Sequence, residues 1–172
     1  MTITDLSTQE YDSYYKRYID KLSSRLDLRE GFEIGKENII AFFQSIPRSK
    51  HNYQYDDDKW TVKEILQHLI DTERVFMYRC FRIARRDKTP LAGFDQDIYI
   101  KPSGAKDKQI DELLEEYTIC RQNSVSVLAS ISDHDLQFIG NANGGDMSAR
   151  AAAFTIIGHE IWHMDIIKER YL

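Results

Sequence analysis

The sequence predicts an all-α protein that folds as a four-helix bundle. Apolar residues recur at helical spacing along nearly the whole chain, and no segment shows the apolar-polar alternation of a half-buried strand. Proline and glycine are scarce, with 3 and 8 among 172 residues, which permits long uninterrupted helices. The loops between the predicted helices are very unequal in length, which is typical of a bundle with a crossover connection. We therefore expect a single domain over residues 1–172 with a long crossover loop.

Residues 1–27 are predicted to form an N-terminal extension that packs on the bundle, because they are rich in tyrosine and hold only short helical stretches. The first long helix is predicted over residues 28–46, since Pro47 cannot continue it. The polar residues 47–58 follow as a loop.

The second helix has the clearest start. Thr61 is expected to cap it, and Glu64 completes a capping box. A stripe at helical spacing then continues to about Arg86. Residues 87–107 come next and hold two prolines and two glycines. So long a connection crosses the bundle or contributes to a site.

The third helix is predicted over residues 108–131 and the fourth over residues 148–170, with Ser148 as its cap. The loop between these helices contains Asn143-Gly144-Gly145, which supplies the residues of a tight turn. The sequence indicates no strand in this loop.

Composition excludes two classes of partner. The formal net charge is −5, and the only basic cluster is Arg82, Arg85, Arg86 and Lys88, which argues against nucleic-acid binding. The sequence has no secretory signal and no apolar run of about 18 residues, so we expect a cytoplasmic protein without a membrane partner.

The fourth predicted helix contains the sequence HEIWH. Its two histidines, His159 and His163, are four residues apart and so project from one helical face. Apolar residues flank that face, which is expected to point inward. Two buried imidazoles each need a polar partner, and one shared metal ion provides it for both. The alternative is a pair of core histidines with separate hydrogen-bond partners.

His68 is the expected third ligand. It lies in the middle of the second predicted helix, at the edge of an apolar stripe. Alone it would be interpreted as a core histidine, but it completes a site if the second and fourth helices touch. Three neutral imidazoles hold zinc or a similar divalent ion and leave a position open for water or substrate.

The string HEIWH also matches the zinc-protease motif H-E-x-x-H. In metzincins a glycine and a third histidine follow soon after, but the residues that follow here are MDIIKERYL. No predicted strand is present to line an extended peptide. The sequence therefore argues against a metalloprotease.

Two acidic residues are candidates for catalysis. Glu160 would serve as a base beside the metal, although its rotation of about 100° from His159 favours a position on the helix surface. Asp71 would orient a ligand imidazole, and an ordinary contact with Arg74 is an equally good interpretation. Arg121 is expected in a buried structural ion pair.

The crossover loop supplies candidate substrate-binding residues, namely Asp95, Gln96 and Tyr99 in the sequence GFDQDIYI. They would either overhang the metal site or only pack the loop. The two cysteines, Cys80 and Cys120, lack the spacing of a metal or redox motif and are expected to be buried free thiols.

Three segments together resemble the DinB/YfiT-like superfamily. They are KWTVKEILQHLIDTERVF, the loop sequence GFDQD, and GHEIWHMDIIKERYL, and the likeness is greatest over residues 60–172. The resemblance implies an up-down-down-up four-helix bundle, often a homodimer, that holds nickel or zinc through three histidines. On this chain those histidines are His68, His159 and His163.

The resemblance fixes the chemistry less closely than the site. Some relatives transfer low-molecular-weight thiols to electrophiles, so it implies a metal-dependent thiol S-transferase acting on a small-molecule substrate. A metal-dependent hydrolase of a small molecule and a non-catalytic, stress-related metal-binding protein are the alternatives.

Overall fold

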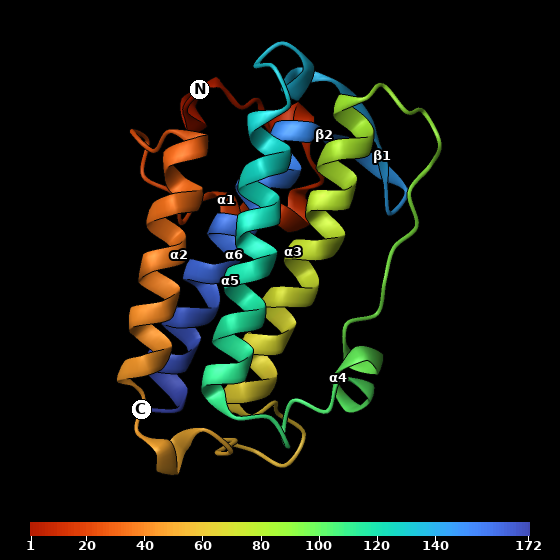
Figure 1. Cartoon of the computed structure of the whole chain (residues 1–172). Helices are drawn as coiled ribbons and strands as arrows, with labels where there is room; N and C mark the ends of the chain where they lie inside the picture. Colours follow the sequence, from red (N-terminus) through yellow and green to blue (C-terminus); the bar gives the residue numbers. More distant parts are fainter.

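The computed structural model describes residues 1–172, and four long helices form its body (Figure 1). They are α2 (Leu28–Ser45), α3 (Val62–Ala84), α5 (Ile110–Ala129) and α6 (Ala149–Arg170). Helices α2 and α6 run in one direction, and α3 and α5 run in the other (Figure 1). The predicted four-helix bundle with up-down-down-up topology is thus confirmed.

The crossover follows from this topology. Helices α3 and α5 are parallel neighbours, so the chain between them must return along the whole bundle (Figure 1). The returning segment contains α4 (Asp97–Ser103), a short helix within what the sequence predicted to be a loop. Helix α3 also contacts α6, and this antiparallel pair carries all three candidate ligands. No helix combines the length and apolar character that a membrane crossing requires.

The helix starts are explained by their caps. Thr61 and Glu64 form the predicted capping box of α3, with the Thr61 amide donating to Glu64 Oε2 at 2.8 Å. Ser148 caps α6 by accepting from the Ala151 amide at 3.0 Å. Asp27 caps α2 in the same way. The long helices begin within two residues of their predicted positions because these caps are local in sequence.

The prediction of no strand was wrong in the loop before α6. A hairpin of β1 (Ile139–Ala142) and β2 (Gly145–Ser148) forms there. Its turn residues Asn143 and Gly144 have φ angles of 55° and 82°, the left-handed values of a tight hairpin turn. The turn chemistry was visible in the sequence, but strands of four residues are too short to show alternation.

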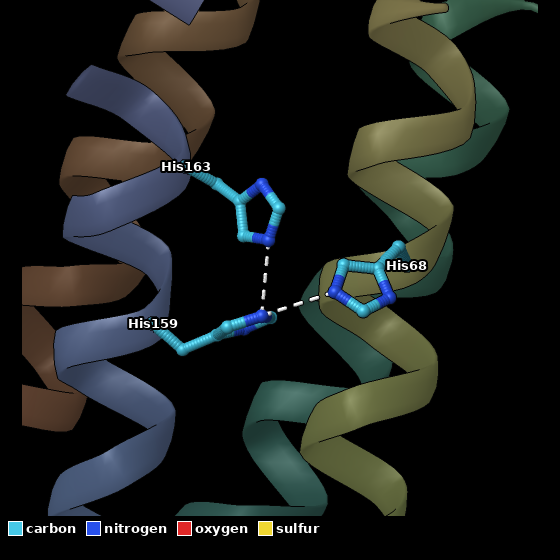
Figure 2. Close-up of side chains that lie close together, drawn as sticks. All are labelled: His68, His159 and His163. Carbon is cyan, nitrogen blue, oxygen red and sulfur yellow. Dashed lines mark hydrogen bonds between the residues drawn. The ribbon is translucent and has the colours of Figure 1, made fainter. Parts of the chain in front are cut away.

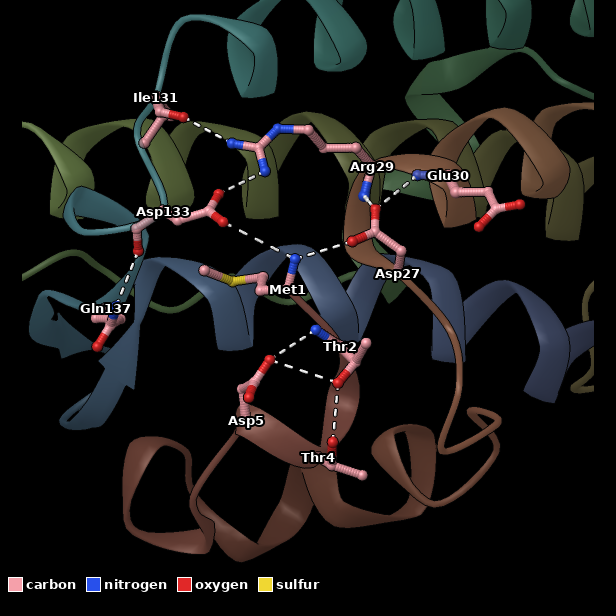
Figure 3. A network of polar contacts seen from close by, with 10 residues as sticks. All are labelled: Met1, Thr2, Thr4, Asp5, Asp27, Arg29, Glu30, Ile131, Asp133 and Gln137. Carbon is pink, nitrogen blue, oxygen red and sulfur yellow. Dashed lines mark hydrogen bonds and ion pairs between the residues drawn. The ribbon is translucent and has the colours of Figure 1, made fainter.

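The first 27 residues lie against the bundle and contain only short helices, which are η1 (Ile3–Asp5), η2 (Thr8–Glu10), η3 (Ser13–Tyr15) and α1 (Lys16–Ile19). Polar contacts fasten the start of the chain (Figure 3). The Met1 amino group donates to Asp27 Oδ2 at 2.8 Å, and Arg29 links α2 to Asp133 at 2.6 Å and to the Ile131 carbonyl at 2.8 Å. This segment places Tyr18 beside the candidate site.

Helix α1 meets α6 at Gly158, where a Cβ atom would lie 2.2 Å from the backbone oxygen of Tyr18. Backbone cannot yield as a flexible side chain does, so Gly158→Ala is expected to destabilise the protein by about 1–3 kcal/mol. Thermal denaturation measures the change. Gly145→Ala is the control, because its Cβ would meet its nearest atom at 3.7 Å. Equal melting temperatures for both variants would contradict the close packing of α1 on α6.

Candidate metal centre

The contact between α3 and α6 brings the three predicted ligands together. His159 and His163 stand one above the other on α6, and His68 faces them from α3 (Figure 2). Their exposed fractions are only 5%, 5% and 7% for His68, His159 and His163. One nitrogen from each ring converges on a common point, and all three atoms lie within 4.8 Å of one another.

Hydrogen bonding among the three rings leaves the cluster incompletely satisfied. The Nε2 atom of His159 lies 3.0 Å from Nε2 of His68 and 3.0 Å from Nε2 of His163. A neutral imidazole nitrogen offers either one N–H or one lone pair, so His159 cannot satisfy both neighbours well. The buried Nδ1 atom of His163 has no partner at all.

A divalent metal fits this donor set. Ligands bound at about 2.0–2.1 Å in a tetrahedral site lie roughly 3.3–3.4 Å apart, close to the 3.0 Å that separates the His159 Nε2 atom from each of the other two Nε2 atoms. The lone pairs of all three Nε2 atoms would point at the ion, and the Nδ1–H of His68 would face Thr72 Oγ1, which lies 3.4 Å away.

Burial also keeps the imidazoles in the state that binds metal. It lowers the pKa of His68 to about 4. The pKa of His159 falls well below its usual value because of burial and the two neighbouring rings, and that of His163 falls because of burial and His68. All three rings are therefore neutral near pH 7, with lone pairs available to a metal ion.

Aromatic rings enclose the cluster. The Trp60 ring lies 4.6 Å from that of His68, between centroids, and stacks more distantly on His163 at 6.5 Å. The rings of Tyr18 and His159 meet edge to face, with their centroids 5.1 Å apart. Sequence reasoning did not identify Trp60, Tyr18 or Thr72 as neighbours of the site. Only Thr72, four residues after His68 on one helix, left a signal that could have been used.

A cavity of about 290 Å³ adjoins the cluster on one side, and His68 and His159 both contribute to its wall. Of the three residues of the crossover loop named as candidates for substrate binding, Gln96 lines the same cavity. The other two candidates do not. Asp95 accepts from the Asp97 amide at 3.0 Å at the start of α4, and Tyr99 packs on Phe94 with its ring 39% exposed.

Glu160 is not a surface residue, and that expectation was wrong. It is 3% exposed, accepts a hydrogen bond from the Tyr117 hydroxyl at 2.8 Å, and pairs with Arg121. Burial raises its pKa to about 7, against the lowering effect of Arg121. A rotation of 100° from His159 leads into the bundle, where Tyr117 and Arg121 of α5 contact Glu160 and Gly35 of α2 lies close to it. The apolar run AAAFTII just before the motif was the available signal.

Arg121 holds the centre of this buried network, as predicted. It donates to Glu73 from Nε at 2.8 Å and from Nη2 at 2.9 Å, and to the Phe32 carbonyl at 3.0 Å. Glu160 is therefore turned toward Arg121, and its carboxylate forms part of the buried polar network in the core of the bundle.

The remaining candidates lie apart from the imidazoles. Asp71 forms an ion pair with Arg74 at 3.0 Å, the second of its two predicted roles. Cys80 and Cys120 are buried free thiols, and burial raises the pKa of each to about 12. Neither cysteine lines the cavity beside the histidines, so the protein's own thiols supply no thiolate there.

Comparisons with known proteins identify the family of this chain and a solved structure with the same fold. YfiT from Bacillus subtilis, described as a probable metal-dependent hydrolase with an unusual four-helix bundle topology, superposes with a TM-score of 0.73. The match covers 95% of this chain and 90% of YfiT at 17% sequence identity, which establishes a shared fold. No curated protein shows significant sequence similarity to the chain. The sequence profile of the DinB superfamily matches residues 32–167, and this chain belongs to that superfamily.

Proposed function

We propose that this protein is a metal-dependent enzyme whose divalent ion, zinc or nickel, is held by His68, His159 and His163. The observation that carries the proposal is the convergence of three neutral, buried imidazoles, two of which line a cavity. Imidazole nitrogens suit both zinc and nickel. No fourth histidine, cysteine or carboxylate joins the cluster, which favours a catalytic site over a closed structural one.

The reaction that fits this site best is transfer of a low-molecular-weight thiol to an electrophile. A divalent metal in the cluster would lower the pKa of a thiol or a water molecule bound beside it. A thiol whose pKa is lowered in this way would release its proton to water at neutral pH, so the reaction would need no protein base. This proposal is supported because Glu160, the only carboxylate in the HEIWH sequence, faces Tyr117 and Arg121, which both contact its Oε1 atom.

The surrounding residues have separate tasks in this proposal. Trp60 and Tyr18 exclude water from two sides of the imidazoles. Thr72 orients His68 through Nδ1, and Gln96 offers an amide to a molecule in the cavity. The buried cysteines do not compete with the thiol cosubstrate because their pKa values are raised to about 12.

Hydrolysis of a small molecule is the second candidate. It is favoured by the structural similarity to YfiT, which is itself described as a probable metal-dependent hydrolase. The same open position that accepts a thiol accepts water, so the two reactions differ in the nucleophile that the cavity admits.

A panel of thiols distinguishes the two. The purified protein, loaded with zinc or nickel, is mixed with monochlorobimane and one thiol at a time, and bimane fluorescence reports transfer. We expect a metal-dependent rate with at least one thiol and background rates for His68→Ala. The control is His134→Ala, which removes an exposed histidine far from the cluster in sequence. Background rates with every thiol, together with metal-dependent ester or amide hydrolysis, would replace transfer by hydrolysis.

A further inference from the structure

Arg79 lines the cavity beside the metal centre although the proposed chemistry gives it no role. It lies on α3, eleven residues after His68, so three helical turns place both side chains on nearly the same face. Thr72 and Phe76 lie between them on that face and also line the cavity. One wall of the cavity therefore carries an imidazole at one end and a guanidinium at the other.

The guanidinium is buried without a counter-charge. Arg79 is 2% exposed and donates one hydrogen bond, from Nη2 to the Ala92 carbonyl at 3.0 Å. Its Nε and Nη1 atoms have no partner. The rings of Phe76 and Phe94 lie 4.8 Å and 5.7 Å from its Cζ atom, which gives cation-π contact but accepts no hydrogen bond.

The guanidinium of Arg121 is equally buried, but its hydrogen-bond donors have partners. Arg121 is 0% exposed and donates to two carboxylates and a backbone carbonyl. Arg79 has no carboxylate partner, and the Asp12 carboxylate, which lines the same cavity, instead caps η3 by accepting from the Tyr14 amide at 2.8 Å. A buried charge without a partner is costly, so an anion entering the cavity would gain strongly from pairing with Arg79.

We infer that Arg79 is an anion-binding residue and that the molecule bound in the cavity carries a carboxylate. The inference rests on the proposed function, because it names the class of substrate or cosubstrate for that same site. A carboxylate is favoured over a phosphate dianion because Arg79 is the only arginine or lysine in the cavity wall, and the Asp12 carboxylate in the same wall would repel a second negative charge. Eleven residues of helix separate the two ends, so the carboxylate lies several bonds from the atom that meets the metal.

The surroundings suit the organic part of such a molecule. Phe76, Phe94 and Tyr15 line the cavity near the guanidinium and offer apolar area. Tyr15 lines the same cavity as Arg79, and burial raises the pKa of its hydroxyl although the positive charge of Arg79 opposes that rise. Tyr15 thus remains a neutral hydroxyl that can donate to the same carboxylate.

The test compares matched probes on the metal-loaded protein by isothermal titration calorimetry. Benzoate and benzamide share their size and ring and differ in charge, and inorganic phosphate is the third probe. We expect benzoate to bind the wild type more tightly than benzamide or phosphate. Arg79→Gln is expected to weaken benzoate binding by about tenfold or more and to leave benzamide unchanged. Arg85→Gln, on an exposed arginine of the same region, is the control and should bind benzoate like the wild type.

Several results would overturn the inference. Equal affinity of the wild type for benzoate and benzamide would show that the cavity does not distinguish a negatively charged ligand from a neutral one. Benzoate binding that survives in Arg79→Gln would place the anion on the metal, and tighter binding of phosphate would refute the carboxylate. If Arg79→Gln does not fold, Arg79→Lys replaces it, and unchanged benzoate affinity there would refute paired hydrogen bonding by the guanidinium. Metal content and thiol transfer are measured separately, so a protein that prefers benzoate but transfers no thiol refutes only the transfer reaction.

Discussion

Replacing His68 and His159 together by alanine is expected to abolish metal binding by this protein. The wild type, purified without a histidine tag, should contain about one zinc or nickel ion per chain, measured by elemental analysis. Residues that only orient a ligand already change metal affinity by about 10- to 100-fold when mutated, so the loss of a ligand should exceed that range. His159 matters most, because its Nε2 atom lies 3.0 Å from both other rings.

Stability gives an independent measure of the same site. A ligand present at about 1,000 times its dissociation constant stabilises a protein by about 4.1 kcal/mol. Chelation should therefore lower the melting temperature of the wild type and leave that of the double variant unchanged. The control is His51→Ala, because the His51 ring hydrogen-bonds to the Ile46 carbonyl at 3.1 Å and lies outside the histidine cluster, so this variant should retain the metal. Full metal content in the double variant would refute the three-histidine site.

The clustering of the three histidines could be predicted because its signals are local. The four-residue spacing of His159 and His163 fixes their common face once the segment is helical. His68 required one further assumption, that α3 and α6 are neighbours, and the bundle topology supplied it. Helix starts were equally accessible, since Thr61 and Ser148 act on amides within three residues.

Features that depend on packing between elements could not be predicted in the same way. Glu160 was expected at the surface because the sequence does not reveal that Tyr117 and Arg121 of α5 reach this side of α6. Arg79 and Tyr18 enter the cavity wall only after the crossover loop and the N-terminal segment have packed on the bundle. A charged residue in a helical stripe has the same sequence signature whether it is paired, as Arg121 is, or unpaired, as Arg79 is.

Replacing Arg121 by alanine is expected to destabilise the protein by about 3–5 kcal/mol, because it leaves two buried carboxylates without a counter-charge. Glu73 is 1% exposed and Glu160 is 3% exposed, so water cannot replace the guanidinium. For a chain of this size that loss lowers the melting temperature by roughly 6–20 °C. Calorimetry or circular dichroism measures the change.

Arg74 provides a matched control. It too contacts two carboxylates, those of Asp71 and Glu116, each at 3.0 Å, but its side chain is 49% exposed. Arg74→Ala should therefore cost less than about 1 kcal/mol. If uncompensated charge causes the loss in Arg121→Ala, adding Glu73→Gln and Glu160→Gln to it should restore part of the stability. Equal losses for Arg74→Ala and Arg121→Ala would refute burial as the cause. An Arg121→Ala protein that also binds metal more weakly would show that this network holds α6, and with it His159, in position against α3.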